Sequence, residues 1–268
     1  MIRLAVRVRR EHAELVLAEL LELAPGGVEE RDEGDVVEYA VYGAPGELPA
    51  LPDLRAAAGA ALVEVATTEV ADDWDERWKA FHQPVRVGDF LVRPPWGPPQ
   101  NGLLDIVIDP AQAFGTGAHP TTRLCLELMR ELEPRGALVD LGCGSGVLAI
   151  AAARLGWAPV LGLDHDPEAV RATRANAAAN GAAVQVLRHD LMRDGPAPGA
   201  PTVLANLLRP LLLRVAAEGF AGAAPDALVA SGLLAGEGDE VAAAFAAHGL
   251  REVARRREGE WIALLLQR

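Results

Sequence analysis

The stretch that most constrains the fold is residues 138–147, LVDLGCGSGV. A short apolar run carries Asp140, and Gly142, Gly144 and Gly146 then occupy every second position before a helical pattern begins. Glycines let the backbone turn tightly and let a ligand approach it closely, and the following helix N-terminus presents unpaired N–H groups. The pattern indicates a strand, a ligand-binding loop and a helix, with a plain structural turn as the alternative.

A regular alternation of strands and helices surrounds this loop from about residue 103 onward. The expected strands are 104–108, 137–141, 159–164, 184–188, 202–206, 227–231, 250–257 and 260–266, and the expected helices lie near 120–132, 147–155, 167–180, 209–221 and 236–248. This order predicts an α/β fold with a Rossmann-like sheet of seven strands and helices on both faces. The last two strands are so close in sequence that they predict an antiparallel C-terminal hairpin.

Residues 1–70 form a separate pattern of strand, helix, strand, strand, helix and strand, which is the ferredoxin-like order. This segment holds 14 acidic and 6 basic residues, a net charge of −8. We expect a small α+β domain whose acidic surface docks a substrate, with a solvated domain of no separate function as the alternative.

Residues 71–102 are rich in tryptophan and proline and predict a connector that forms a structured loop or short strands. The expected domains are therefore a docking domain at 1–70, the connector at 71–102 and a catalytic domain at 103–268.

Charge and cysteine content exclude several classes of function. The 268 residues carry a formal net charge of −13, which repels phosphate backbones and argues against nucleic-acid binding. Only Cys125 and Cys143 are cysteines, so neither a disulfide framework nor a cysteine-rich zinc site is expected, and we expect no metal. No signal peptide or membrane-length apolar stretch is evident, so we expect a cytoplasmic protein.

The glycine loop narrows the class of ligand. A dinucleotide fingerprint needs glycine at its sixth position, which is Val147 here, and a phosphate-binding P-loop needs a lysine that is absent. A Gly-x-Gly-x-Gly loop behind an acidic residue is typical of S-adenosylmethionine enzymes. Asp140 suits the ammonium group of that donor, at least through a water molecule.

Two further polar residues stand at the ends of predicted strands. Asp164 lies 22 positions beyond Gly142, at the spacing where an acidic residue binds ribose hydroxyls. Asn206 ends the strand 202–206 and can hold an amine by accepting its protons. Ligands in open α/β sheets bind beyond the carboxyl ends of the strands, so we expect these residues to share one crevice.

Residues 109–125 form a polar loop before the first helix of the catalytic domain. Thr121 and Thr122 can cap that helix. Asp166, directly before Pro167, is expected to cap the helix near 167–180. His119 in this loop is more often a surface histidine than a catalytic one.

Several motifs together resemble one family: AFGTGAHPTT, LVDLGCGSGVLAIAA, GLDHDP, the Asn176 and Asn180–Gly181 pair, and VLANLL. They are similar to the bacterial ribosomal protein L11 methyltransferases (PrmA type), over about residues 72–268. The resemblance implies donor contacts from Thr122, Gly142, Asp164 and Asn206, with Gly144 in the same loop, and a loop carrying Phe114 and Thr116 that closes over the donor.

We therefore expect methyl transfer from S-adenosylmethionine to amino groups of ribosomal protein L11, namely lysine side chains and the N-terminal amine. Asn206 orients the acceptor, and His119 is the only candidate general base. The partner is expected to be the free, basic substrate protein, and the enzyme a monomer. The alternatives are another acceptor, a non-catalytic donor-binding module, and a nicotinamide dehydrogenase, against which the missing sixth-position glycine counts.

Overall fold

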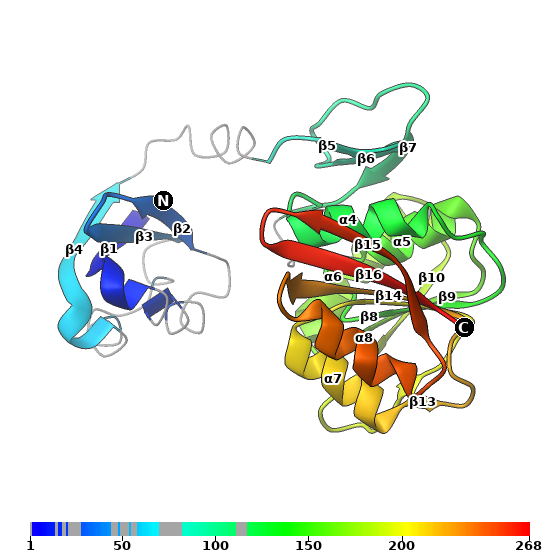
Figure 1. The fold of residues 1–268 in the computed structure, drawn as a ribbon. Helices are drawn as coiled ribbons and strands as arrows, with labels where there is room; N and C mark the ends of the chain where they lie inside the picture. Colours follow the sequence, from blue (N-terminus) through cyan, green and yellow to red (C-terminus); the bar gives the residue numbers. More distant parts are fainter. Residues whose placement is uncertain are drawn as a thin grey trace. The chain divides into compact units, whose positions relative to one another are not determined.

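The computed structural model describes residues 2–13, 16–17, 20, 28–43, 48, 54, 58–69, 82–110 and 117–268. The chain divides into two compact units, residues 1–81 and 82–268, and each unit is described by itself (Figure 1). No helix in the described ranges is long and apolar enough to span a membrane.

The first unit contains a four-stranded antiparallel sheet in the order β2-β3-β1-β4. Its strands are β1 (Ile2–Arg9), β2 (Glu29–Asp32), β3 (Val36–Gly43) and β4 (Leu62–Glu69), with short 3-10 turns at Arg10–His12 and Gly59–Ala61. Alternate residues of β1, such as Leu4, Val6 and Val8, are buried in the core. This strand order is the one that a ferredoxin-like arrangement requires, and parts of the expected helices 11–23 and 54–62 lie outside the described residues.

The second unit is built on a seven-stranded sheet in the order β10-β9-β8-β12-β14-β16-β15. The parallel strands are β8 (Leu138–Leu141), β9 (Val160–Asp164), β10 (Val184–Arg188), β12 (Thr202–Asn206) and β14 (Ala227–Leu234). Strands β15 (Arg251–Glu258) and β16 (Trp261–Gln267) are antiparallel and complete one edge of the sheet. The expected strand–helix alternation is confirmed.

The chain order along this sheet reverses between β8 and β12, which lie side by side. Such a switch point opens a crevice at the carboxyl ends of the strands.

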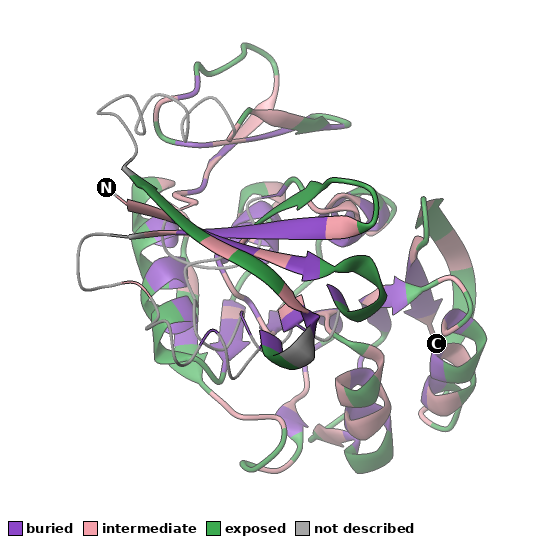
Figure 2. Cartoon of the chain, turned by 90° about the vertical axis from the view of Figure 1, so that its left-hand side faces the viewer, coloured by how far each residue is buried: buried purple, intermediate pink, exposed green. Residues whose placement is uncertain are grey.

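Helices cover both faces of this sheet. They are α4 (Pro120–Met129), α5 (Val147–Leu155), α6 (Pro167–Ala179), α7 (Arg209–Glu218) and α8 (Gly238–Ala246). Leu138 and Leu204 belong to the core with α4 and α5, while their neighbours Val139 and Val203 belong to the core with α7 and α8. Period-two alternation thus divides each strand between two apolar layers, and the helices keep their exposed residues on the outer side (Figure 2).

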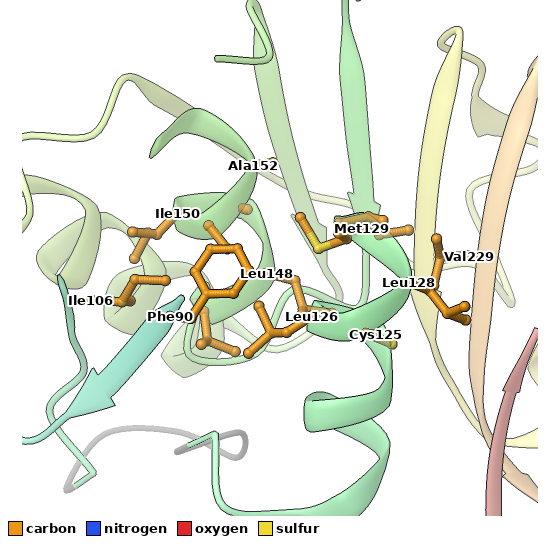
Figure 3. Close-up of a cluster of buried hydrophobic side chains, with 14 of the residues drawn as sticks. Phe90, Ile106, Cys125, Leu126, Leu128, Met129, Leu148, Ile150, Ala152 and Val229 are labelled. Atoms are coloured by element: carbon orange, nitrogen blue, oxygen red, sulfur yellow. The ribbon is translucent and has the colours of Figure 1, made fainter. Parts of the chain in front are cut away.

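Residues 85–107 form a separate three-stranded sheet within this unit. Strand β6 (Phe90–Arg93) pairs antiparallel with β5 (Val85–Val87) and parallel with β7 (Leu104–Val107). Phe90 and Ile106 are fully buried beside Leu126 and Leu148 of the helical layer (Figure 3). Full burial of one such apolar side chain contributes about 1.5–3 kcal/mol. The short strands expected here are confirmed, and the expected strand 104–108 belongs to this small sheet because β6 pairs with it. Two short strands, β11 (Ala197–Pro198) and β13 (Phe220–Ala221), pair in parallel as a separate sheet.

Candidate functional site

The glycine loop follows β8 and has no space for side chains at Gly142. This residue has φ +70°, and a Cβ atom built on it would lie 2.5 Å from Leu207 Cδ2. Gly144 and Gly146 also have positive φ, at +53° and +85°. The Gly142 N–H donates to the carbonyl of Leu163 at 2.8 Å, so the loop is held against the end of β9. Its backbone is therefore open to close approach by a ligand.

Asp140 lies beneath this loop and is only 1% exposed. Its Oδ2 accepts a hydrogen bond from the Ala149 N–H at 3.1 Å, in the first turn of α5. The helix needs this acceptor because its N-cap residue, Gly146, has no side chain. Among the described residues Oδ1 has no hydrogen-bond partner. Burial, with a smaller contribution from the negative charge of Asp164, raises the pKa of Asp140 to about 8.

Asp164 ends β9 and joins the glycine loop to the start of α6. Its Oδ2 accepts from the Gly144 N–H at 2.9 Å, and its Oδ1 accepts from the Asp166 N–H at 3.0 Å. Asp166 caps α6 through the Glu168 N–H, which confirms the cap expected from the sequence. His165, beside Asp164, is largely exposed.

A cavity of about 190 Å³ opens at the switch point of the sheet. It is lined by Gly142, Leu163, Asp164, His165, His189, Asp190, Leu191, Met192, Leu207 and Leu211. His189 Nε2 is buried and has no hydrogen-bond partner in the described part of the chain. Buried polar atoms are nearly always paired, so this nitrogen marks a place for a ligand atom or a water molecule.

Sequence reasoning missed His189 and Asp190, although a signal was present. The two residues follow β10 directly, just as the chemistry-bearing residues Asp164 and Asn206 end β9 and β12. The rule that selected those strand ends would have selected this pair as well.

Asn206 and Thr122 come together although they are far apart in the sequence. The Asn206 amide Nδ2 lies 3.5 Å from Thr122 Oγ1, at the limit of a hydrogen bond. Thr122 is buried in the first turn of α4. Neither residue lines the cavity, but Leu207, which follows Asn206, does. The structure thus brings Gly142 and Asp164 together at the cavity. Asn206, which Thr122 contacts, directly precedes the cavity residue Leu207 and ends the strand beside β8.

His119, and neither threonine after it, is the N-cap of α4, so the expected threonine cap is wrong. Its Nδ1 lies 2.8 Å from Thr121 Oγ1 and accepts from the Thr121 N–H at 3.4 Å. Pro120 occupies the first turn, as its fixed φ favours. The His119 ring packs edge-on against Trp261, with 5.0 Å between the ring centroids. Burial, and then the charge of Arg123, lower the pKa of His119.

The remaining expectations have different outcomes. Phe114 and Thr116 lie outside the described residues. Burial raises the pKa of the Cys143 thiol in the loop to about 12, so this cysteine is not a ready nucleophile. In the described ranges, no group of three or more histidine, cysteine or acidic side chains is placed to hold a metal ion.

Comparisons with known proteins agree with one another. A family model described as ribosomal protein L11 methyltransferase (PrmA) matches residues 50–268. The chain is 43% identical over 206 residues to a ribosomal protein L11 methyltransferase of Geobacter metallireducens, covering 75% of this chain and 68% of that protein. It is 35% identical over 301 residues to the protein of that name from Pelotomaculum thermopropionicum, covering 98% and 97% of the two chains. A solved ribosomal protein L11 methylase from Lactobacillus delbrueckii subsp. bulgaricus matches with a TM-score of 0.61 and 26% identity, over 70% of this chain and 99% of that one.

The buried carboxyl group of Asp140 predicts a pH dependence of stability. Its pKa is raised in the folded state, so the folded protein holds a proton there that the unfolded chain has lost above about pH 4. Its contribution is full below the unfolded pKa and is lost as pH rises toward about 8. We expect the stability of the wild type relative to Asp140→Asn to fall as pH rises from 5 to 8, by up to about tenfold in the unfolding constant per pH unit.

Urea unfolding of both proteins at four pH values measures this difference. The asparagine keeps an acceptor for Ala149, so the helix cap is preserved in the control. A difference that stays constant across the range would contradict a protonated Asp140.

Proposed function

The chain belongs to the ribosomal protein L11 methyltransferase family, and we propose that it transfers methyl groups from S-adenosylmethionine to amino groups of ribosomal protein L11. The observation that carries the proposal is the convergence of the glycine loop and Asp164 on one cavity, with Asn206 at the neighbouring strand end. Family membership rests on the model match over residues 50–268 and on the relative that covers 98% of the chain.

The described residues fit the proposed methyl donor. The glycine loop offers backbone with no side chain at Gly142. Within the part of the chain that the structure describes, no lysine or arginine lines the cavity, which suits a cationic sulfonium ligand. Each Asp164 oxygen accepts one backbone N–H, and its remaining lone pairs can accept the ribose hydroxyls. The unpaired His189 Nε2 offers a further polar contact in the cavity. The donor supplies an activated methyl group, and no other chemistry is required of it.

Gly144, Thr122 and Asn206 complete the proposed donor contacts. Asp140 is buried and caps α5, so its contact with the donor ammonium would be relayed by water. Phe114 and Thr116 keep the role that the family resemblance gives them, as part of the loop next to the donor.

The acceptor must be a neutral amine with a lone pair aimed at the methyl group. A lysine side chain has an unperturbed pKa of about 10.4, so roughly one in a thousand is neutral near pH 7. Desolvation in the crevice and a nearby sulfonium charge both lower that pKa. Since Asn206 Nδ2 faces Thr122 Oγ1, Asn206 Oδ1 is the atom proposed to accept a hydrogen bond from the amine. Positioning of this kind supplies up to about 7–11 kcal/mol in well-aligned reactions.

The acidic first unit is the proposed docking domain for the substrate. Residues 1–70 carry a net charge of −8, and the edge strand β2 exposes Glu29, Glu30 and Asp32. A basic substrate protein complements this surface, and the net charge of −13 disfavours RNA, so we propose that the enzyme meets the free substrate in the cytoplasm as a monomer. The proposed division is docking at 1–70, a connector at 71–102 and catalysis at 103–268.

Intact-mass measurement tests the proposal. Purified, unmodified ribosomal protein L11 is incubated with the full-length enzyme and S-adenosylmethionine. We expect the mass of the substrate to increase by about 14 Da for each methyl group transferred. No added mass, with donor binding still measured by calorimetry, would move the acceptor to another protein. No added mass and no donor binding would overturn the proposed function altogether.

Substitutions at Asn206 and Asp164 are expected to have different effects, the first on turnover and the second on donor binding. Asn206→Ala should lower kcat by about a hundredfold or more and leave the donor dissociation constant nearly unchanged, because an acceptor-orienting group acts mainly in the transition state. Asp164→Asn should mainly weaken donor binding, since it removes the carboxylate proposed for the ribose hydroxyls. Calorimetry with S-adenosylhomocysteine, together with steady-state kinetics, distinguishes them, and equal losses in both measurements for Asn206→Ala would exclude its assigned role.

His119 has two candidate roles that one pair of variants separates. As a helix cap it should be replaceable by asparagine, which is among the best N-cap residues, whereas alanine should cost about 1 kcal/mol of stability. As a general base it should not be replaceable, and both variants should lose about 10²–10⁴-fold in kcat. We expect His119→Asn to keep the wild-type stability but to lose turnover. Wild-type kcat in this variant would limit His119 to capping α4.

A further inference from the structure

Two residues of α6 and its C-cap residue, Asn180, hold the backbone around the proposed donor site. Thr173, Asn176 and Asn180 are spaced by three and four positions, so they lie on the same side of the helix. Thr173 and Asn176 are buried, at 0% and 4% exposure, and Asn180 is partly buried. None of the three has a direct part in the reaction proposed above.

The three side chains bind different backbone segments. Thr173 Oγ1 donates to the Gly144 carbonyl at 2.8 Å, so it holds the glycine loop. Asn180 holds the end of β7, since its Oδ1 accepts from the Val107 N–H at 2.8 Å and its Nδ2 donates to the Val107 carbonyl at 2.7 Å.

Asn176 binds both segments at once. Its Nδ2 donates to the Ser145 carbonyl at 2.8 Å, inside the glycine loop, and its Oδ1 accepts from the Asp109 N–H at 3.1 Å, just beyond β7. The amide group is planar and rigid, so a shift of the Ser145 carbonyl moves the Asn176 side chain and changes its hydrogen bond to the Asp109 N–H. Buried hydrogen bonds of this kind are costly to leave unmade, which keeps the two movements linked.

We propose that Asn176 couples the glycine loop to the end of β7, so that a ligand on the loop stabilises the backbone at Asp109. Asn176 is in this view a positioning residue for donor binding, and the proposal rests on the function proposed above.

Amide hydrogen exchange and calorimetry on the full-length protein test the coupling, with S-adenosylhomocysteine as the probe. In the wild type we expect the bound probe to slow exchange of the Asp109 amide. Asn176→Ala should abolish that slowing and raise the dissociation constant of the probe by about tenfold, the effect of one lost hydrogen bond.

Two matched variants separate coupling from general loss of stability. Asn180→Ala removes bonds from the same helix to the same β7 segment but none to the loop, so it should bind the probe within about twofold of the wild type. Thr173→Val removes a bond to the loop only, so the slowing at Asp109 should remain when the probe is saturating.

The outcomes distinguish this inference from the proposed function. If Asn176→Ala binds the probe as the wild type does, or keeps the slowing at Asp109, Asn176 has no coupling role. If the wild type itself binds no S-adenosylhomocysteine, the proposed function fails and this inference fails with it.

Discussion

At Gly142 and Gly146 the turn between β8 and α5 has no room for a side chain, and the rest of the candidate site depends on this constraint. Gly142 is packed against Leu207, and a Cβ atom on Gly146 would lie 2.7 Å from Thr173 Cγ2. Both glycines have positive φ, where other residues are strained. The first turn of α5 is therefore left without a side-chain cap, and the preceding strand supplies the acceptor from Asp140. One tight turn thus explains both the open backbone at the cavity and the buried carboxyl group beneath it.

The loop is held in place by polar side chains from the neighbouring strand and helix. Asp164 binds it through Gly144, and Thr173 and Asn176 bind it through two successive carbonyls. Burial of Asp140 favours its neutral form and raises its pKa, and the nearby negative charge of Asp164 acts in the same direction.

The contact between Thr122 and Asn206 joins elements that are distant in sequence. Thr122 comes from α4 and Asn206 from β12, and the small sheet β5-β6-β7 packs on the helical layer through Phe90 and Ile106 (Figure 3). This apolar packing fixes the end of β7, while Asn176 and Asn180 fix its backbone through hydrogen bonds. Apolar burial supplies most of the stability, and the directional hydrogen bonds set the position of the backbone at Val107 and Asp109.

Sequence by itself determined the strand–helix alternation, the glycine turn and the strand ends Asp164 and Asn206, because periodicity and glycine geometry are local properties of the chain. It also determined the Asp166 cap, whose partner is two residues away. Only the tertiary structure decided that Asp140 caps α5 and that residues 85–107 form a sheet on the helical layer. It also placed His189 at the cavity and gave Asn176 its two partners. The physical reason is that these features depend on burial and on hydrogen bonds between segments that the linear sequence keeps far apart.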